Sequence, residues 1–381
     1  MVPEGFIPVL AEAVGAEMAE EVVEALAGEP SVSIRLNPAK LRECPFPEAV
    51  PIPWNPYGYL LGERPSFTLD PLYHAGCYYV QDSSAMFVGE AVRQVLERFG
   101  AGISVLDLCA APGGKTTDIA ASLREAFGDD FSLLANEVMK NRFGTLRANV
   151  RTWGENRVGV VSRDPSAFGR EKAFDLIVAD VPCSGEGMFR KDARAAAEWS
   201  EETVRFCAAR QRRILSDVWP GLRPGGVLIY STCTFNRWEN DDNVAWAASE
   251  LGADILPPAE FPPILRTRHG SLLLPGHVPG EGQYAAILVK HGEHPSVRSC
   301  DIFTRFRAER PVTPPQACPC WEVDRQTALH YLHGDALVLP DAPAGLITIT
   351  YKGHPLGPAK NIGRRCNNLY PKESRIRMDI R

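Results

Sequence analysis

The sequence predicts an α/β fold: a doubly wound, Rossmann-like parallel sheet with a small N-terminal α+β module and a small β-rich C-terminal domain. Two observations support this prediction. Strand-like and helix-like segments alternate from about residue 78 to 290, and several strand-like runs, such as 174–179, are almost continuously apolar, as in strands covered on both faces. Ligands bind beyond the carboxyl ends of such strands, so the loops that follow them are the candidate site.

The alternation also gives the order of the elements in this sheet. The predicted strands are 103–108, 131–136, 158–162, 174–179, 226–231 and 284–290. The predicted helices are 83–99, 115–126, 140–149, 201–219 and 238–251. Because successive strands are separated by helices, we expect them to run parallel.

The flanking segments differ in composition from the sheet. Residues 12–26 have helical spacing and 31–38 alternate like a strand, whereas 44–71 are rich in proline. Residues 291–320 show no clear period, and short alternating strands separated by Gly and Pro follow them. The predicted division is an N-terminal module at 1–69, a central domain at 70–290, a linker at 291–325 and a C-terminal domain at 326–381.

The composition of the 381 residues limits the classes of function. No apolar run is long enough to span a membrane, and the first residues lack the basic flank and apolar core of a secretory signal, so a cytoplasmic protein without membrane contact is expected. The ten cysteines are scattered, with no two pairs at metal-ligand spacing. This spacing favours reduced thiols over disulfides, and no metal is expected. A monomer is the expected state.

Charge is unevenly distributed along the chain. The formal net charge is −6, but residues 345–381 contain eight Lys or Arg and two Asp or Glu, which leaves +6 in this tail and −12 elsewhere. A basic tail of this kind can contact a polyanion, and the alternative is a basic face that only water solvates.

A glycine-rich loop, CAAPGGK, joins the first strand of the sheet to a helix. Its glycines permit a ligand to approach the backbone and the helix N-terminus closely. The loop is not a P-loop, which requires a glycine at the position of Cys109, and it lacks the G-x-G-x-x-G dinucleotide pattern. It fits the first motif of S-adenosylmethionine-dependent methyltransferases. The residues predicted to bind this cofactor are Cys109, Ala110, Ala111, Pro112, Gly113, Gly114 and Lys115.

Acidic residues follow the next strands. Glu137 comes after 131–136, where a carboxylate can bind the two ribose hydroxyls of the cofactor, and Asp164 follows the third strand, where it can contact the adenine amino group. Asp180 ends the strand at 174–179 and is predicted to face the cofactor as well. Each acid alone is more often an ordinary loop carboxylate, but acids at three successive strand ends favour a nucleoside-bearing cofactor.

Two cysteines follow neighbouring strands. Cys183 lies in the loop DVPCSGEG, and Cys233 lies in YSTCTF after the strand at 226–231. An isolated cysteine at a strand end is more often a small buried apolar side chain. Two cysteines at one edge of the sheet, flanked by Asp180 and Pro182, instead predict a reactive pair.

Together, CAAPGGK, DVPCSGEGMFRKD and YSTCTF resemble the motifs of the Sun/nucleolar-protein (RsmB/RsmF-type) family of RNA cytosine-5 methyltransferases, and within it the bacterial 16S rRNA enzymes. The resemblance is dense from about 70 to 290 and weak before Pro71, and YKGHPLGPAKN and NLYPK look like the family's PUA-like C-terminal module. It implies that Arg142 also belongs to the cofactor site. Val181 stands where Ala is commoner, and the chain after Lys290 is shorter than in the longest relatives.

The resemblance implies a reaction and a role for each residue. Cys233 adds to C6 of cytosine, which makes C5 nucleophilic toward the methyl group, and Cys183 serves the release of the adduct. Asp180, when it is protonated or bridges to N3 of the ring, stabilises the charge that develops during the addition. The cation that lowers the pKa of the attacking thiol is expected to be Arg190 or Lys191.

The implied substrate is single-stranded or flipped-out cytosine in RNA, with ribosomal RNA first, transfer RNA second, and the small ribosomal subunit as a further partner. The N-terminal module and the basic tail are expected to hold the surrounding RNA. Cys109 disfavours an NTPase, and Asp180-Val181-Pro182-Cys183 differs from the Asp/Asn-Pro-Pro-aromatic loop of exocyclic-amine methyltransferases. A non-catalytic RNA-binding assembly factor is the remaining alternative, and the presence of both cysteines counts against it.

Overall fold

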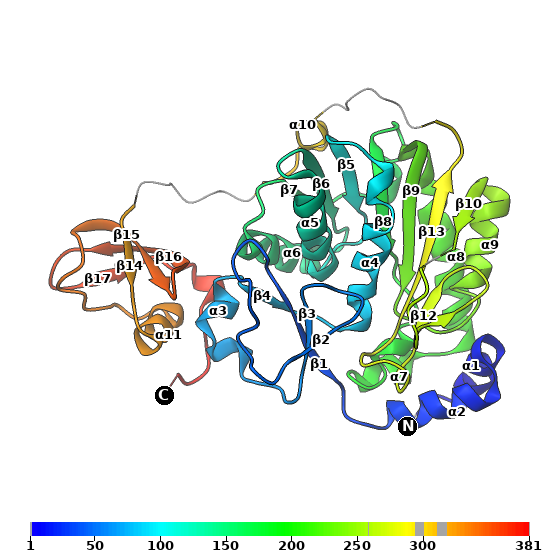
Figure 1. Ribbon diagram of the computed structural model, residues 1–381, viewed down its shortest axis with the longest axis horizontal. Coiled ribbons are helices and arrows are strands. Elements are labelled where there is room, and N and C mark those ends of the chain that lie inside the picture. The colour runs from blue at the N-terminus through cyan, green and yellow to red at the C-terminus, as the bar shows by residue number, and fades with distance from the viewer. Residues whose placement is uncertain (1, 258, 294–300, 311–317, 381) are drawn as a thin grey trace.

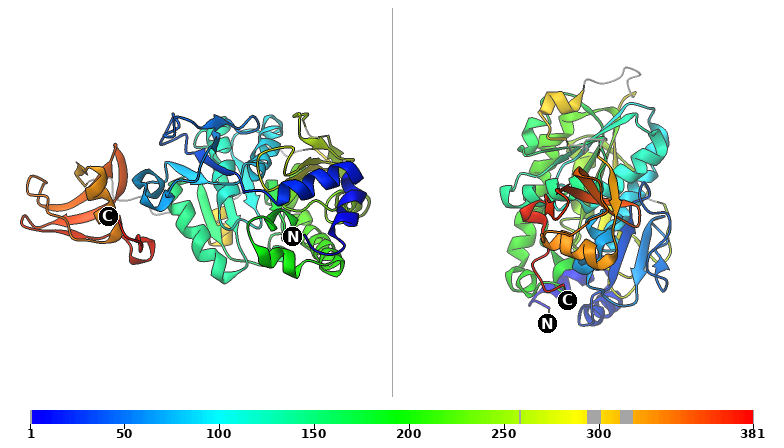
Figure 2. Two further views of the ribbon diagram at one scale, coloured as in Figure 1. Left: turned by 90° about the horizontal axis from the view of Figure 1, so that it is seen from below. Right: turned by 90° about the vertical axis from the view of Figure 1, so that its left-hand side faces the viewer.

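A computed structural model describes residues 2–257, 259–293, 301–310 and 318–380 (Figure 1). These residues form a four-stranded sheet near the N-terminus, a nine-stranded central sheet and a four-stranded C-terminal sheet. The C-terminal sheet stands to one side of the other two (Figure 2). The predicted fold class, an α/β sheet domain with a small module at each end, is therefore confirmed.

The central sheet has the strand order β11-β12-β13-β9-β8-β5-β6-β7, and β10 also pairs with β13. Its strands are β5 (Ile103–Asp107), β6 (Phe131–Asn136), β7 (Val158–Val161), β8 (Phe174–Asp180), β9 (Leu222–Thr232), β10 (Ala253–Leu256), β11 (Leu265–Arg266), β12 (Ser271–Leu273) and β13 (Gln283–Lys290). All six strands predicted from the sequence are present, as β5 to β9 and β13.

The sheet is mixed rather than parallel, and this corrects the sequence prediction. Strands β5 to β9 run parallel, whereas β13 is antiparallel to β9, with Ile287 opposite Ile229. The chain reverses between β12 and β13, which pair antiparallel with Leu273 opposite Gln283. An apolar run predicts a buried strand but carries no signal of its direction, so the reversal was not predictable from the pattern alone.

Helices cover both faces of the sheet. They are α4 (Phe87–Arg93), α5 (Gly114–Phe127) and α6 (Lys140–Trp153) on one face, with α8 (Glu201–Val218) and α9 (Asp241–Glu250) on the other. Successive strand residues point to opposite faces: Val105 and Leu176 join the core under α4 and α5, while Leu106 and Ile177 join the core under α8 and α9. The helix predicted at 83–99 is interrupted, since only its middle forms α4 and short 3-10 turns flank it.

The N-terminal module consists of two helices and a small sheet. Its elements are α1 (Phe6–Val14), α2 (Ala16–Leu26), β1 (Val32–Leu36), β2 (Val50–Pro51), β3 (Gly58–Leu61), α3 (Pro71–His74) and β4 (Tyr78–Val80). Because β4 pairs with β1, this sheet continues beyond residue 69, where the sequence placed the end of the module. Helix α1 packs on the central domain, with the Phe6 ring centroid 5.1 Å from that of Phe189 and 5.7 Å from that of Trp199.

Part of the segment expected to be a linker is packed against the central sheet. Helix α10 (Ile302–Phe306) places Phe306 with its ring centroid 5.2 Å from Phe168 and 5.6 Å from Phe174. The backbones of Glu309 and Val160 then pair as in an antiparallel bridge. The residues 301–310 therefore extend the core of the central domain, because the side chains of Ile302, Phe303 and Phe306 are buried there.

The C-terminal module consists of β14 (Cys320–Glu322), α11 (Arg325–His333), β15 (Gly345–Tyr351), β16 (His354–Asn361) and β17 (Cys366–Asn368). Its core is continuous with that of the N-terminal module, since Leu329 and Tyr331 belong to the same buried cluster as Leu72 and Tyr78. Arg325 Nη2 also donates to Leu69 O over 3.0 Å. Among the described helices, none has both the length and the apolar character needed to cross a membrane.

Candidate active site

The ends of β8 and β9 bring Cys183 and Cys233 together. The two strands pair in parallel with Asp180 opposite Ser231, so the loops that follow them begin at the same level. The two Sγ atoms lie 3.2 Å apart, within hydrogen-bonding distance and well beyond the length of a disulfide bond. The two cysteines predicted to share one edge of the sheet are thus adjacent free thiols.

The surroundings of the two thiols differ. The hydrogen bond to Cys233 and burial raise the pKa of Cys183 well above its ordinary value, and the charge of Glu239 adds to this shift. Deprotonation of Cys183 is therefore disfavoured. Either sulfur can donate the proton in the S–H···S contact.

Lys115 and Asp180 form an ion pair beside the sulfurs. Lys115 Nζ lies 2.9 Å from Asp180 Oδ2, and Asp180 Oδ1 accepts from Ser231 Oγ over 2.8 Å and from Gln283 Nε2 over 3.2 Å. Burial alone would lower the pKa of Lys115, but Asp180 and, to a smaller extent, Cys233 raise it. Lys115 is therefore a half-buried ammonium whose charge acts on both Asp180 and Cys233.

Arg190 and Lys191, the cations named from the sequence, have other partners. Arg190 Nε lies 2.7 Å from Glu281 Oε2, and Lys191 Nζ lies 3.1 Å from Asp82 Oδ2 and 3.4 Å from Glu281 Oε1. The sequence predicts Lys115 only as part of the cofactor loop, because nothing in the linear pattern indicates that the first turn of α5 lies beside the end of β8. No sequence signal pointed to Gln283 or Glu281 either.

The last residue of β5, Asp107, is a buried acid that the sequence prediction did not name. Asp107 Oδ2 accepts from Thr116 Oγ1 over 2.6 Å, while Asp107 Oδ1 is buried without a hydrogen-bond partner in the described part of the chain. Burial raises the pKa of Asp107 to about 7. The sequence signal that could have identified Asp107 is an acidic residue inside the apolar run VLDL. Gly113 has a φ of +111°, which a residue with a side chain rarely adopts, and it turns the loop into α5.

Glu137 and Arg142 lie at the mouth of this loop. Glu137 is buried at the end of β6, where its Oε1 accepts from Met139 N over 2.7 Å and its Oε2 lies 3.7 Å from Arg142 Nη1. Arg142 also donates to Ala111 O. Arg142 thereby connects the end of β6 to the glycine-rich loop.

The remaining predicted positions have mostly structural contacts. Ala110 N donates to Asn136 O over 2.8 Å, and Pro112 O accepts from Asn149 Nδ2 over 2.8 Å. Burial raises the pKa of Cys109, so this thiol is neutral. Asp164 is exposed after β7 and caps the 3-10 turn Pro165–Ala167 through Ser166 N, so its contact with adenine stays a prediction.

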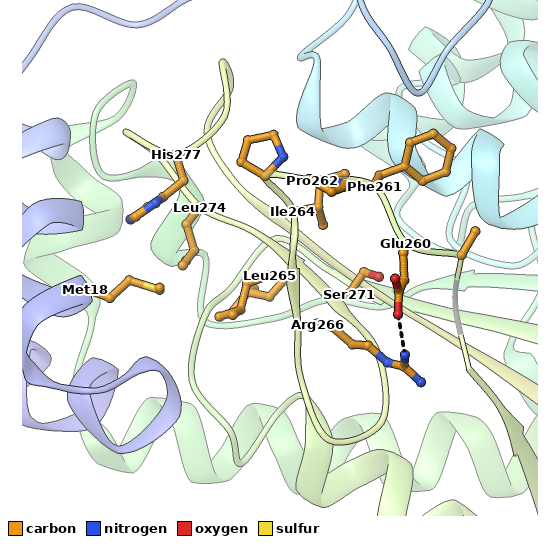
Figure 3. Close-up of a pocket in the computed structure, with 13 residues that line it drawn as sticks. Met18, Glu260, Phe261, Pro262, Ile264, Leu265, Arg266, Ser271, Leu274 and His277 are labelled. Carbon is orange, nitrogen blue, oxygen red and sulfur yellow. Dashed lines mark hydrogen bonds and ion pairs between the residues drawn. The ribbon is translucent and has the colours of Figure 1, made fainter.

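A separate pocket lies between α2 and the edge strands β11 and β12 (Figure 3). It is lined by apolar side chains such as Met18, Ile264 and Leu274, with His277 at one side and the Glu260–Arg266 ion pair, 3.0 Å long, at the other. None of the predicted site residues lines it. Among the described residues, no group of three or more His, Cys, Asp or Glu side chains is arranged to hold a metal ion.

Comparison with known families gives the family of the chain. Residues 97–289, just over half of the chain, match the family described as 16S rRNA methyltransferase RsmB/F. The chain belongs to this family. The resemblance drawn from the three sequence motifs is thereby confirmed. Residues 2–83 match the N-terminal domain of 16S rRNA methyltransferase RsmF, and residues 318–376 match the methyltransferase RsmF PUA domain.

Individual proteins with similar sequences are small-subunit ribosomal RNA methyltransferases by name. Ribosomal RNA small subunit methyltransferase F of Klebsiella pneumoniae is 36% identical over 276 residues, which are 67% of this chain and 56% of that protein. The protein of the same name from Salmonella paratyphi A is 29% identical over 467 residues, covering 97% of this chain and 96% of the relative. In the three relatives at 36% identity the aligned part is 56%, 52% and 47% of their length, so the chain spans about half of each.

A solved structure extends the comparison to three dimensions. The methyltransferase homolog protein from Pyrococcus horikoshii is 27% identical, with a TM-score of 0.62, and the match covers 74% of this chain and 93% of that one. The RsmB/F-family chain therefore has the fold of a solved methyltransferase homologue over most of its length.

Proposed function

We propose that this RsmB/F-family chain transfers a methyl group from S-adenosylmethionine to C5 of a cytosine in RNA, with 16S rRNA as the substrate. The observation that carries the proposal is the pair of sulfurs of Cys183 and Cys233, 3.2 Å apart, beside the Lys115–Asp180 ion pair of 2.9 Å. A cysteine sulfur next to an ammonium ion is suited to add, as a thiolate, to an electron-poor ring carbon.

Two acids beside the glycine-rich loop fit S-adenosylmethionine. Asp107 offers a buried carboxylate oxygen without a partner among the described residues, and Glu137 offers a second buried carboxylate at the next strand end. We assign Glu137 to the ribose hydroxyls, Asp164 to the adenine amino group and the loop from Cys109 to Lys115 to the rest of the molecule. When bound, this cofactor supplies the methyl group as an electrophile.

We assign the addition step to Cys233. Its thiolate bonds to C6 of the cytosine, and the electron pair of the C5–C6 double bond moves toward C5 and the N3 side of the ring. Lys115 and Asp180 are close enough to one another to act as a unit on the charge that develops there, and their partial burial strengthens the effect. C5 is thereby made nucleophilic and receives the methyl group.

We assign the release step to Cys183. After methylation the C5 proton passes to a solvent water that acts as the base, the electrons of the C5–H bond restore the C5–C6 double bond, and the bond between C6 and Cys233 Sγ breaks to return the thiolate. Cys183 is the group in hydrogen-bond contact with that sulfur, so it is placed to assist this elimination. The two cysteines thus act at opposite ends of one covalent cycle.

The RNA must present an unstacked cytosine, because both faces of the ring have to be reached. We assign the surrounding RNA to the N-terminal module and to the C-terminal module, whose match to a PUA domain supports this role. The acting form is proposed to be a cytoplasmic monomer that binds 16S rRNA alone or within the small ribosomal subunit.

The test is methylation of defined RNA by the purified chain. Labelled S-adenosylmethionine should transfer its methyl group to 16S rRNA, and bisulfite sequencing should locate 5-methylcytosine that is absent from a strain lacking the gene. Transfer RNA from the same two strains serves as the control. If the modified cytosine appears in transfer RNA and not in 16S rRNA, the substrate assignment is wrong, and if neither is modified, the proposed activity is wrong.

A further inference from the structure

A buried polar cluster joins the loop that carries Cys183 to the loop that carries Cys233. The proposed reaction does not use this cluster. We call this cluster the loop clamp. It consists of Ser184, Glu186, Gln211, Asn236 and Glu239. Glu186 and Glu239 are both fully buried, which is costly for carboxylates unless hydrogen bonds compensate them.

Glu186 belongs to the Cys183 loop but holds the Cys233 loop. Its Oε2 accepts from the backbone N–H of Phe235 over 2.6 Å and of Asn236 over 3.1 Å. Its Oε1 accepts from Trp199 Nε1 over 3.0 Å. Two consecutive backbone groups just after Cys233 are therefore fixed by a side chain from the other loop.

Glu239 holds the Cys183 loop in the reciprocal way. Its Oε2 accepts from Ser184 N over 3.0 Å and from Gln211 Nε2 over 2.6 Å. The same Gln211 Nε2 donates to Pro182 O over 3.0 Å. The residues on both sides of Cys183 are thus tied, directly or through Gln211, to a carboxylate that follows Cys233 in the chain.

Asn236 joins the two carboxylates. Its Nδ2 lies 2.9 Å from Glu186 Oε1 and 2.9 Å from Glu239 Oε1. Two further contacts cross between the loops, the Ser184 Oγ to Thr234 Oγ1 hydrogen bond of 2.9 Å and the Gly187 N to Cys233 O hydrogen bond of 2.9 Å. Movement of one loop against the other would break several of these bonds at once, so the separation of the sulfurs depends on the clamp.

We propose that Glu186 and Glu239 are positioning residues with separate tasks: Glu186 holds Cys233 for addition to the base, and Glu239 holds Cys183 for release of the adduct. This inference rests on the proposed function, because it assigns the two carboxylates to the two halves of that covalent cycle. It predicts that loss of Glu186 has the same kind of effect as loss of Cys233, and loss of Glu239 the same kind of effect as loss of Cys183, in each case to a smaller extent.

The test compares Glu239→Ala and Glu186→Ala in the full chain with 16S rRNA and S-adenosylmethionine. Glu239→Ala should reduce turnover by about ten- to hundredfold and accumulate a protein–RNA conjugate on a denaturing gel, while the KM for RNA changes by less than about twofold. Glu186→Ala should reduce turnover similarly without accumulating the conjugate. With RNA that contains 5-fluorocytosine, which blocks release, Glu186→Ala should form the conjugate more slowly than wild type and Glu239→Ala at nearly the wild-type rate.

Asp175→Asn is the matched control. Asp175 is a buried carboxylate at the opposite end of β8, paired with Arg223, so its loss perturbs stability without touching the clamp. This variant should show neither conjugate accumulation nor slow trapping. Glu239→Gln and Glu186→Gln are the second pair of variants, because the amide keeps one acceptor oxygen. They should change conjugate accumulation and the trapping rate in the same directions by smaller factors. These variants decide the test if the alanine variants do not fold.

The proposal is overturned if wild type is active and the two glutamate variants behave like Asp175→Asn, or if both accumulate the conjugate equally. Absence of methylation by wild type would instead contradict the proposed function, so the two failures are distinguishable. Cofactor affinity measured by calorimetry confirms folding of each variant, because the glycine-rich loop is not part of the clamp.

Discussion

The carboxyl edge of the central sheet and the C-terminal module use charged side chains in opposite ways. At the edge, Asp107, Lys115 and Asp180 lie largely out of solvent and have fixed partners within the fold. In the C-terminal module, cations such as Lys360 and Arg365 are exposed around the β16–β17 hairpin. Charges that stabilise a reacting ring are strongest when desolvated and fixed, whereas charges that bind phosphates must be reachable from water.

This difference implies that chemistry and RNA binding can be changed separately. Substitutions at the sheet edge should affect the covalent cycle and spare RNA binding, and substitutions at the hairpin should do the reverse. The following predictions test this separation, beginning with the largest expected effect.

The two cysteines should fail in different ways. Cys233→Ala removes the sulfur that bonds to the base, so methylation should disappear with RNA binding retained. Cys183→Ala leaves addition possible but impairs release, so a conjugate that resists denaturation should accumulate. The measurement is a denaturing gel of each variant with RNA and cofactor. A conjugate with Cys233→Ala and none with Cys183→Ala would reverse the roles, and unchanged turnover in both would exclude the mechanism.

Lys115 should matter far more than Lys191. Lys115→Met removes the ammonium that pairs with Asp180, and we expect turnover to fall by about 10²–10³-fold, the range for loss of one preorganised electrostatic group. Lys191→Met is the matched control, because that lysine is paired with Asp82 and Glu281. Single-turnover methylation at saturating RNA and cofactor measures the effect. Equal losses in the two variants would mean that Lys115 has no special part in the reaction.

Glu239 should make stability depend on pH. Burial raises its pKa from the ordinary 4.5 to about 7, so the folded chain binds this proton more tightly than the unfolded chain does. The resulting stabilisation is fully present below about pH 4.5 and is lost as the pH rises through about 7, a change of up to about 3 kcal/mol. Urea unfolding at pH 5 and pH 8 should therefore show a larger loss in wild type than in Glu239→Gln. The same pH dependence in both proteins would mean that Glu239 is not the source of this pH-dependent stability.

Glu137→Ala should weaken cofactor binding without changing RNA binding. The expected loss is about 1.5–3 kcal/mol, as for hydrogen bonds to a charged group. Isothermal calorimetry with S-adenosylmethionine measures it, and Glu155→Ala is a control in which the lost carboxylate pairs with Arg124 at another part of the surface. Unchanged affinity in Glu137→Ala would remove this residue from the ribose site.

Substitution of the basic side chains of the β16–β17 hairpin should weaken RNA binding and reduce its salt dependence, while cofactor affinity stays unchanged. Deleting 345–381 would remove β15 to β17, three of the four strands of that sheet, so substitution is the cleaner test. Replacing Lys360, Arg364 and Arg365 by Gln should lower the slope of log K against log salt by about 2, given about 0.7 per phosphate contact with a single strand. The exposed Arg98, Arg205 and Arg213, replaced in the same way, are the matched control. An unchanged slope would mean that the hairpin is only solvated surface.

Much of the site was predictable from local patterns. The apolar runs of β8 and β9 and the polar loops after them were sufficient to place Cys183 and Cys233 at one edge of the sheet, and Glu137 followed from the end of β6. These predictions depend on the burial of each strand, which its own residues determine, and on the rule that parallel strands end at the same edge. The motifs also determined the family.

The partners of the charged side chains were decided only by the tertiary structure. Lys115 is 65 positions from Asp180 in the chain, and the reciprocal bonds of Glu186 and Glu239 cross between loops about 50 positions apart. The direction of β13 and the packing of α10 on the sheet were likewise absent from the local pattern. A side chain's burial follows from its own segment, but its charge is balanced by whichever groups the fold brings within hydrogen-bonding distance, and those come from distant segments.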